Sequence, residues 1–244
     1  MQAIIVNIKF ELVQALRIPM VYVGMLFLPS VGMLLYVLPS AHSPGTIVMS
    51  TASMCLFTVL ILCSAQYGTG IADARMRPWG GFVRTLPGGP VPKMTAMIGL
   101  SLLLAVVGSL PMIGIAALGT DATLPLGRLL LGLLALGLAV VPFGLLTLTI
   151  GYAVNPYLVH VLATVLPMVL AYLGGYFADP AADSGFIATI APFTPARGPA
   201  ELVWAAVGDY RINPVSMVML LVWTAVFAVL AARSYRADEG RRFH

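Results

Sequence analysis

Six long apolar runs divide the sequence, and each is long enough to cross a bilayer as an α-helix. A helix rises about 1.5 Å per residue, so about 20 residues match the roughly 30 Å hydrocarbon core. The runs lie near Val21–Leu38, Ile47–Gln66, Met94–Leu118, Leu129–Ile150, Tyr157–Phe177 and Val215–Ala232. They are continuous rather than alternating, which argues against the strands of a transmembrane barrel. Only 9% of the residues are charged, whereas a soluble domain carries about 25%. We therefore expect an all-α integral membrane protein in which residues 1–244 form one six-span domain.

The basic residues are distributed unequally between the two sides of such a bundle. If the N-terminus is cytoplasmic, the inner segments carry Lys9, Arg17, Arg75, Arg77, Arg84, Lys93, Arg233, Arg236, Arg241 and Arg242. The outer segments then carry Arg128, Arg197 and Arg211. Lysine and arginine are enriched in cytoplasmic loops, so this bias predicts a multi-pass cell-membrane protein with both termini in the cytoplasm. No small-x-small cleavage site follows the first run, so we expect that run to be retained.

The segments outside the runs carry three further expectations. Residues 1–19 predict an interfacial amphipathic helix before the first span, and the alternative is a plain helical extension of that span. The outer segment 178–213 holds two apolar patches too short to span, which predicts two short re-entrant helices. The tail "ARSYRADEGRRFH" predicts arginines that pin the last helix to lipid phosphates.

The fifth run has the most informative face. His160, Thr164, Met168, Tyr172 and Tyr176 recur every four residues, beside a second stripe of Ala163, Pro167, Ala171 and Gly175. Small residues let helices approach closely, whereas a polar stripe is costly in lipid and should face protein or a polar cavity. Helix packing, the wall of a substrate path and a subunit interface all remain open. His160 lies near the cytoplasmic end, where a satisfied interfacial histidine is expected.

A polar island, "DARMRPWGGFVRTLPGGP", separates the second and third runs on the cytoplasmic side. The sequence has no nucleotide-binding motif that would let the chain hydrolyse ATP by itself. It has no G-x-x-x-x-G-K-[ST], H-E-x-x-H or C-x-x-C motif, and His42, His160 and His244 are scattered. Cys55 and Cys63 lie within one span, where core packing is the better interpretation. We therefore expect no catalytic residue, no metal and no cofactor in this chain, and no enzymatic activity without a partner.

In order along the chain, several segments resemble the permease subunits of type-2 ABC exporters, which include drug-resistance, polysaccharide and teichoic-acid carriers. The similar segments are "ELVQALRIPMVYVGMLFLPSVGMLLY", the polar island, the outer "APFTPARGPAELVWAAV" and the arginine-rich tail. These segments are spread from residue 11 to residue 244, so the resemblance covers nearly the whole chain. The family's loop more often has Glu and a Gly-Thr pair where this sequence has Asp73 and "WGG".

The resemblance implies that residues 71–93 form a cytoplasmic coupling loop that docks on a separate ATP-hydrolysing subunit. The loop residues implied in coupling are Asp73, Arg75, Arg77, Trp79, Gly80, Gly81, Phe82, Arg84 and Pro87. It also implies two ATPase subunits that hold ATP and Mg²⁺, and a second permease chain, identical or related. The substrate would pass between the permeases, with the fifth-span stripes as candidate walls beside the first and second spans.

The expected cargo is an amphiphilic or hydrophobic compound, such as a drug, an antibiotic or a lipid-linked molecule. We expect lipid contacts and no nucleic-acid partner. The alternatives are a membrane-embedded lipid-modifying enzyme and a non-transport assembly factor, and the island alone could be a merely solvated loop.

Overall fold

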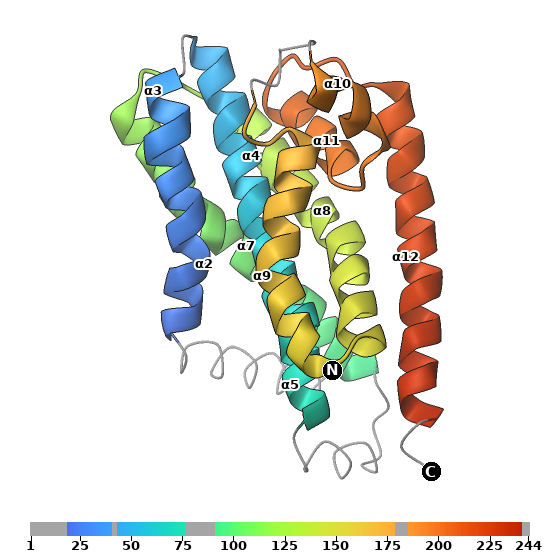
Figure 1. Ribbon diagram of the computed structural model, residues 1–244. Coiled ribbons are helices and arrows are strands. Elements are labelled where there is room, and N and C mark those ends of the chain that lie inside the picture. The colour runs from blue at the N-terminus through green and yellow to red at the C-terminus, as the bar shows by residue number, and fades with distance from the viewer. Residues whose placement is uncertain (1–18, 41–42, 77–90, 179–184, 241–244) are drawn as a thin grey trace.

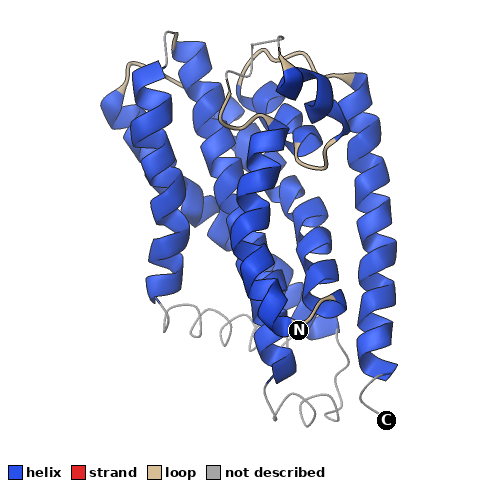
Figure 2. Cartoon of the chain, viewed as in Figure 1, coloured by secondary structure: helices blue, strands red, loops and turns tan. Residues whose placement is uncertain are grey.

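The computed structural model describes residues 19–40, 43–76, 91–178 and 185–240, and every regular element in these ranges is a helix (Figure 2). The N-terminal half contains α2 (Pro19–Gly32), η1 (Met33–Val37), α3 (Leu38–Ser40), α4 (Pro44–Cys63), η2 (Ser64–Thr69), α5 (Gly70–Met76) and α7 (Val91–Gly119). The C-terminal half contains α8 (Leu126–Ala153), α9 (Pro156–Gly174), α10 (Phe186–Ile190), η3 (Ala191–Phe193), α11 (Arg197–Val207) and α12 (Pro214–Gly240). The elements η1 and η2 are π-helical, and η3 is a short 3₁₀ turn.

Five helices among the described residues are long and apolar enough to cross a membrane. They cover Pro44–Met76, Met97–Gly119, Leu126–Ala153, Pro156–Gly174 and Pro214–Asp238. They correspond to the second to sixth apolar runs, so the predicted all-helical character is confirmed for the described residues, and five of the six expected spans are helices that could cross a membrane. The first run folds as α2, η1 and α3, in which the apolar helical stretch Leu26–Leu35 is shorter.

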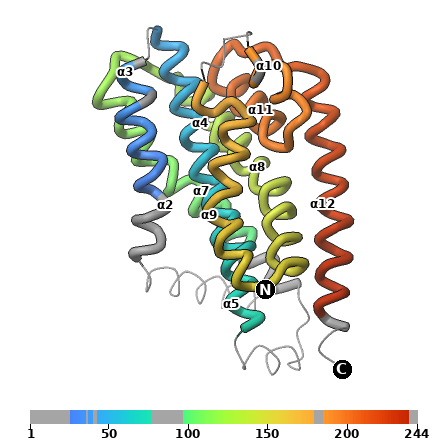
Figure 3. The backbone as a smooth tube through the Cα atoms, viewed as in Figure 1, coloured from blue at the N-terminus to red at the C-terminus, as the bar shows by residue number. Residues whose placement is uncertain are grey.

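The long helices lie side by side, with α2 and α12 on opposite flanks (Figures 1 and 3). The short helices α10 and α11 gather at one end of this bundle, and α5 lies at the other (Figure 1). We call these the α11 end and the α5 end. The helix α4 is central, because 67% of its most apolar window is buried inside the protein, against 17% for α12. It packs against α2, α7, α8 and α11.

Capping residues explain why two helices begin before the apolar runs do. Ser43 Oγ accepts a hydrogen bond from the Thr46 amide at 3.2 Å, and proline follows in the first turn of α4. Asn155 Oδ1 accepts from the Tyr157 amide at 3.0 Å, again with proline next. An accepting N-cap followed by proline is a strong helix start, so polar residues extend these helices beyond their apolar segments.

The second span is one continuous helix that widens into a π-helix at η2 before it ends as α5. The Thr147 hydroxyl of α8 lies 3.1 Å from the Cys63 carbonyl, at the start of the widened segment. The Tyr67 hydroxyl lies 2.9 Å from Ser101 Oγ, and Ser101 also donates to Gln66. These contacts with α7 and α8 stabilise the π-helical segment. The second span therefore does not end at Gln66, as the sequence predicted, but continues to Met76.

The α8 backbone approaches η2 very closely at Gly151. A β-carbon at this position would lie 2.6 Å from the Tyr67 carbonyl oxygen and 3.2 Å from that of Gly68. Both are backbone atoms and cannot move aside by rotating a side chain. At Gly114 on α7, by contrast, a β-carbon would meet nothing within 4 Å.

We therefore expect Gly151→Ala to destabilise the protein by about 1–3 kcal/mol, the usual cost of overpacking. Gly114→Ala is the matched control, and it should be neutral or stabilising by up to about 1 kcal/mol because alanine favours the helix. Thermal unfolding midpoints of the two purified variants in one detergent measure the difference. Equal midpoints would contradict the close packing of α8 on η2.

The predicted segments outside the spans have separate outcomes. Residues 178–213 contain the expected short helices, α10 and α11, joined by η3. The amphipathic helix predicted for residues 1–19 lies outside the described residues, apart from Pro19 at the start of α2. The expected coupling loop 71–93 is helical at both of its described edges, since α5 ends at Met76 and α7 begins at Val91.

Candidate functional site

Arg75 of α5 ties the end of the second span to two other helices. Its Nε lies 3.0 Å from Asp238 Oδ1 on α12. Its Nη1 donates to the carbonyls of Gly151 and Val154 at the end of α8, each at 2.8 Å. The last carbonyls of a helix lack partners within it, and a guanidinium carries five donors in a rigid plane. One arginine therefore caps α8 and clamps α12 at the α5 end.

Asp73 makes a second connection from α5. Its Oδ1 lies 3.1 Å from His160 Nε2 in the first turns of α9. Both side chains are about half exposed, so this pair contributes little to stability on its own. It joins two residues that the sequence analysis assigned to separate groups, the coupling loop and the fifth-span stripe.

An aromatic contact also connects two helices at the α5 end. Tyr152 of α8 and Tyr235 of α12 meet edge to face, with ring centroids 5.3 Å apart. Arg75 and Asp73 thus join α5 to α8, α9 and α12, and the two tyrosines join α8 to α12. This group, which we call the α5 clamp, consists of Asp73, Arg75, Tyr152, His160, Tyr235 and Asp238.

Two of the nine residues predicted for coupling are thus engaged within the chain. Asp73 and Arg75 both contact other helices, as described above. The other seven lie outside the described residues, namely Arg77, Trp79, Gly80, Gly81, Phe82, Arg84 and Pro87. Their role in coupling stays a prediction.

The structure divides the predicted stripes of α9 by exposure. The side chains of Thr164, Met168 and Tyr172 are exposed on the surface of the bundle. In the small-residue stripe, Pro167 and Ala171 are buried within the chain. The small stripe therefore packs against the rest of this molecule, whereas the exposed stripe is available to lipid or to another molecule.

The last residues of both stripes leave the helix. The helix α9 ends at Gly174, and Gly175 takes the left-handed conformation with φ of 81°. The Tyr176 amide then donates to the Ala171 carbonyl at 2.9 Å, and the Gly175 amide to that of Tyr172 at 3.1 Å. This pair of bonds defines a Schellman motif. Tyr176 consequently turns inward, where it is 1% exposed, and does not continue the surface stripe.

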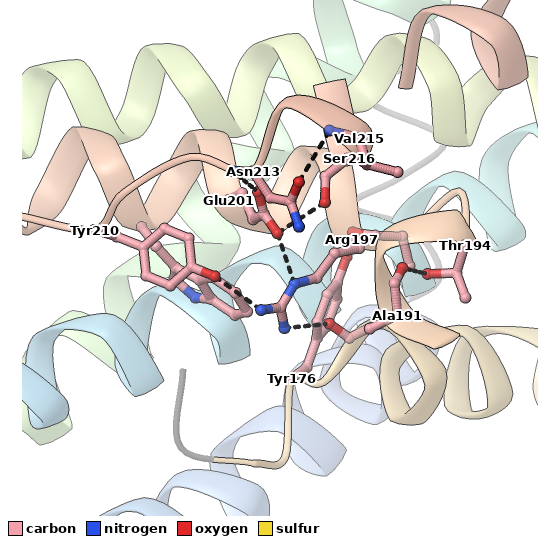
Figure 4. Close-up of polar contacts among 12 residues, drawn as sticks. Tyr176, Ala191, Thr194, Arg197, Glu201, Tyr210, Asn213, Val215 and Ser216 are labelled. Carbon is pink, nitrogen blue, oxygen red and sulfur yellow. Dashed lines mark hydrogen bonds and ion pairs between the residues drawn. The ribbon is translucent and has the colours of Figure 1, made fainter. Parts of the chain in front are cut away.

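A buried polar network at the α11 end was not predicted from the sequence. Arg197 Nε lies 2.9 Å from Glu201 Oε1, one turn along α11 (Figure 4). The other Glu201 oxygen accepts from the Asn213 amide at 2.8 Å, and Ser216 Oγ donates to Oε1 at 2.8 Å. Arg197 Nη2 also donates to the Tyr210 hydroxyl at 2.8 Å. The Glu201 side chain is fully buried, so the carboxylate depends on these partners.

The same network positions α11 on its neighbours. The Arg197 guanidinium lies 4.7 Å from the centre of the Trp204 ring, in cation–π contact. The Trp204 indole donates to Ser53 Oγ of α4 at 2.8 Å, and Tyr176 donates to the Ala196 carbonyl at 3.0 Å. The only sequence signal for this cluster was the i, i+4 spacing of Arg197 and Glu201 in an apolar segment.

The described residues show no cluster suited to metal binding. Within them, no three His, Cys, Asp or Glu side chains come together in a geometry that could hold a metal ion. Cys55 and Cys63 are free, buried thiols in α4. The two polar centres are therefore arrangements that hold helices together, one at each end of the bundle.

Comparisons of the sequence with protein-family models and with curated proteins find no match in either set. The functional argument therefore depends on the residues and their geometry.

Proposed function

We propose that the chain is the membrane subunit of an ATP-driven exporter, as its resemblance to type-2 ABC permeases implies. In this proposal, α2, η1 and α3 supply the sixth span, and the α5 end faces the cytoplasm. The distribution of basic residues supports that orientation, because ten of the thirteen belong to the sequence segments expected on the cytoplasmic side, and Arg75 of α5 is one of them. In this proposal the energy comes from another chain, since the sequence has no P-loop motif of its own.

The α5 clamp is the observation that carries the proposal. Residues 77–90 connect α5 to α7, so a force applied to this loop acts on α5 at one of its two ends. Arg75 then passes that force to α8 and α12, and Asp73 passes it to α9. A merely solvated loop needs no such connection to three helices, whereas a coupling loop does.

The proposed assembly contains two copies of an ATPase subunit, which hold ATP and Mg²⁺, and a second permease chain. The exposed stripe of α9, with Thr164, Met168 and Tyr172, supports a role in lining the substrate path or meeting the second permease, and the half-buried His160 begins the same face. Its mixed aromatic, thioether and hydroxyl character suits an amphiphilic cargo.

Charge reversal in the loop tests this function directly. We expect Arg77→Glu or Arg84→Glu to weaken ATPase binding by about tenfold or more, because misplaced charge at an interface costs several kcal/mol. The chain is co-expressed with a candidate ABC ATPase subunit, and co-purification and stimulated ATP hydrolysis are measured in proteoliposomes. Arg211→Glu, an exposed position at the α11 end, is the matched control.

The proposal fails if both loop variants keep full co-purification and full stimulated hydrolysis. It also fails if Arg211→Glu lowers them as much as the loop variants do, because the effect would then not be specific to the α5 end.

A further inference from the structure

An apolar cavity of about 200 Å³ lies between α4, α7, α8 and α11, towards the α11 end. Its walls include Ala52 and Cys55 of α4, Ala116 of α7, Leu136 of α8 and Val207 of α11. No charged side chain lines it. It is distinct from both the α5 clamp and the exposed stripe of α9.

The polar groups in the wall are not aimed at a ligand. The Thr51 hydroxyl donates to the Ile47 carbonyl of its own helix at 2.7 Å. The Cys55 thiol lies 3.9 Å from the Ser109 carbonyl. The cavity therefore presents hydrocarbon and offers little to a polar molecule. An apolar cavity of roughly 150 Å³ is already large enough to stay dry and to bind a small apolar ligand.

The cavity has fixed walls. The α11 wall, which carries Val203 and Val207, is held to α4 by the hydrogen bond between Trp204 and Ser53. The Glu201 carboxylate of the same helix accepts hydrogen bonds from the Asn213 amide and from Ser216 of α12. With these connections in place, α11 cannot move inward to fill the space without breaking polar bonds.

The opening of the cavity is amphipathic. Ala117 is exposed at its edge, and Ala122 and Leu124 of the loop between α7 and α8 are part of the lining. Arg128 directly precedes the lining residue Leu129, and its side chain is 43% exposed. Its Nη2 lies 2.8 Å from Asp209 Oδ1 in an exposed ion pair, a kind of pair worth only about 0–1 kcal/mol. Asp209 is two residues from the lining residue Val207, so this ion pair joins the ends of two cavity walls, α8 and α11. An anionic group on an apolar chain that enters between these walls would be favoured by the guanidinium.

We propose that this cavity holds the end of one acyl chain of a membrane phospholipid, with the lipid phosphate beside Arg128. The lining runs from Ile47 to Cys55 along α4, which is a depth of about 12 Å at 1.5 Å per residue. That depth and the volume suit the end of a chain rather than a whole lipid. The outer faces of the long helices are apolar and lie in lipid, so acyl chains are the apolar ligand at hand.

Photolabelling tests the proposal on the full chain without any ATPase, so its outcome is independent of the proposed transport function. The protein is reconstituted in vesicles of phosphatidylethanolamine and phosphatidylglycerol that contain a phospholipid with a diazirine near the end of one acyl chain. We expect label on Thr51, Ala52 or Cys55, which are buried away from the outer surface of the bundle. Leu130, Leu134 and Leu138 on the exposed face of α8 serve as the internal standard for ordinary lipid contact.

Filling the cavity provides the matched comparison. The pair Ala52→Leu and Ala116→Leu places bulk in the space, and label on α4 should fall about tenfold or more while label on Leu130 stays constant. Ala225→Leu on the exposed face of α12 is the control for the same change outside the cavity. If the double variant does not fold, Ala116→Leu alone makes the same comparison.

Two results would overturn the proposal with the unchanged protein. The first is label on the exposed leucines of α8 and none on Thr51, Ala52 or Cys55. The second is label on α4 from a free diazirine fatty acid but not from the phospholipid, because the occupant would then come from a different source. Label that persists in the folded, filled variant would overturn it as well.

Discussion

Replacing Arg197 by methionine is expected to lower the free energy of unfolding by about 3–5 kcal/mol, because it leaves the buried Glu201 carboxylate without its countercharge. The carboxylate is fully buried and 2.9 Å from Arg197 Nε. The same change removes the hydrogen bond to Tyr210 and the cation–π contact with Trp204. Thermal unfolding of the purified protein in one detergent measures the loss.

A double-mutant cycle separates the cost of an unpaired charge from the loss of packing. Glu201→Leu removes the other partner, and the double variant Arg197→Met with Glu201→Leu should recover much of the stability, since paired apolar replacements are often tolerated. Arg128→Met breaks the exposed pair with Asp209 and is the matched control, with an expected change of at most about 1 kcal/mol. If Arg197→Met lowers the free energy of unfolding no more than Arg128→Met does, the buried network stabilises the fold no more than an exposed ion pair.

The positions of the helices could be predicted from the sequence because lipid imposes a simple rule. Every backbone group must be bonded within the segment, so a long apolar run has to be a helix. Five runs accordingly became long apolar helices, and the short outer helices were expected for the same reason. The ends were harder to predict, because Ser43 and Asn155 start helices with local hydrogen bonds that hydropathy does not register.

The widening of the second span could not be predicted, because its cause lies in other helices. Thr147 of α8 and Ser101 of α7 hydrogen-bond at the start and the middle of the π-helical segment η2, and both come later in the chain. Likewise, the periodicity of the fifth run assumes a helix that continues through Tyr176. The left-handed turn at Gly175 ends that helix and sends the tyrosine into the core.

The sequence indicated which residues mattered at the α5 end but not how they pair. Asp73 and Arg75 were expected to contact a partner ATPase subunit. His160 was expected at the membrane–water interface, and Asp238 lies in the tail that was expected to anchor the last helix. Arg75 and Asp238 are 163 positions apart, and a single sequence gives no sign of so distant a pair. Apolar periodicity identifies which side of a helix is buried, whereas the choice between a partner in the chain and a partner outside it requires the folded arrangement.

Arg75→Gln is expected to have the second large effect, lowering the stability by about 3 kcal/mol through loss of a charge partner for Asp238, which is 5% exposed. The hydrogen bonds to the Gly151 and Val154 carbonyls are weakened at the same time. Under the proposed function, the stimulated rate of the ATPase should fall to near its basal value even at temperatures where the variant is folded, because α5 no longer moves α8 and α12. Unfolding midpoints and ATP hydrolysis in proteoliposomes measure the two effects separately.

Conservative and matched variants show whether geometry or charge is responsible. Arg75→Lys keeps the charge, but a single ammonium group cannot replace the Nε and Nη1 donors that reach Asp238 and the α8 carbonyls in different directions. It should therefore recover only part of the stability and of the coupling. Arg236→Gln, exposed on the same end of α12, should change the stability by no more than about 0.5 kcal/mol. Full coupling in Arg75→Lys would show that charge alone matters, and full coupling in Arg75→Gln would remove the α5 clamp as the link between loop and bundle.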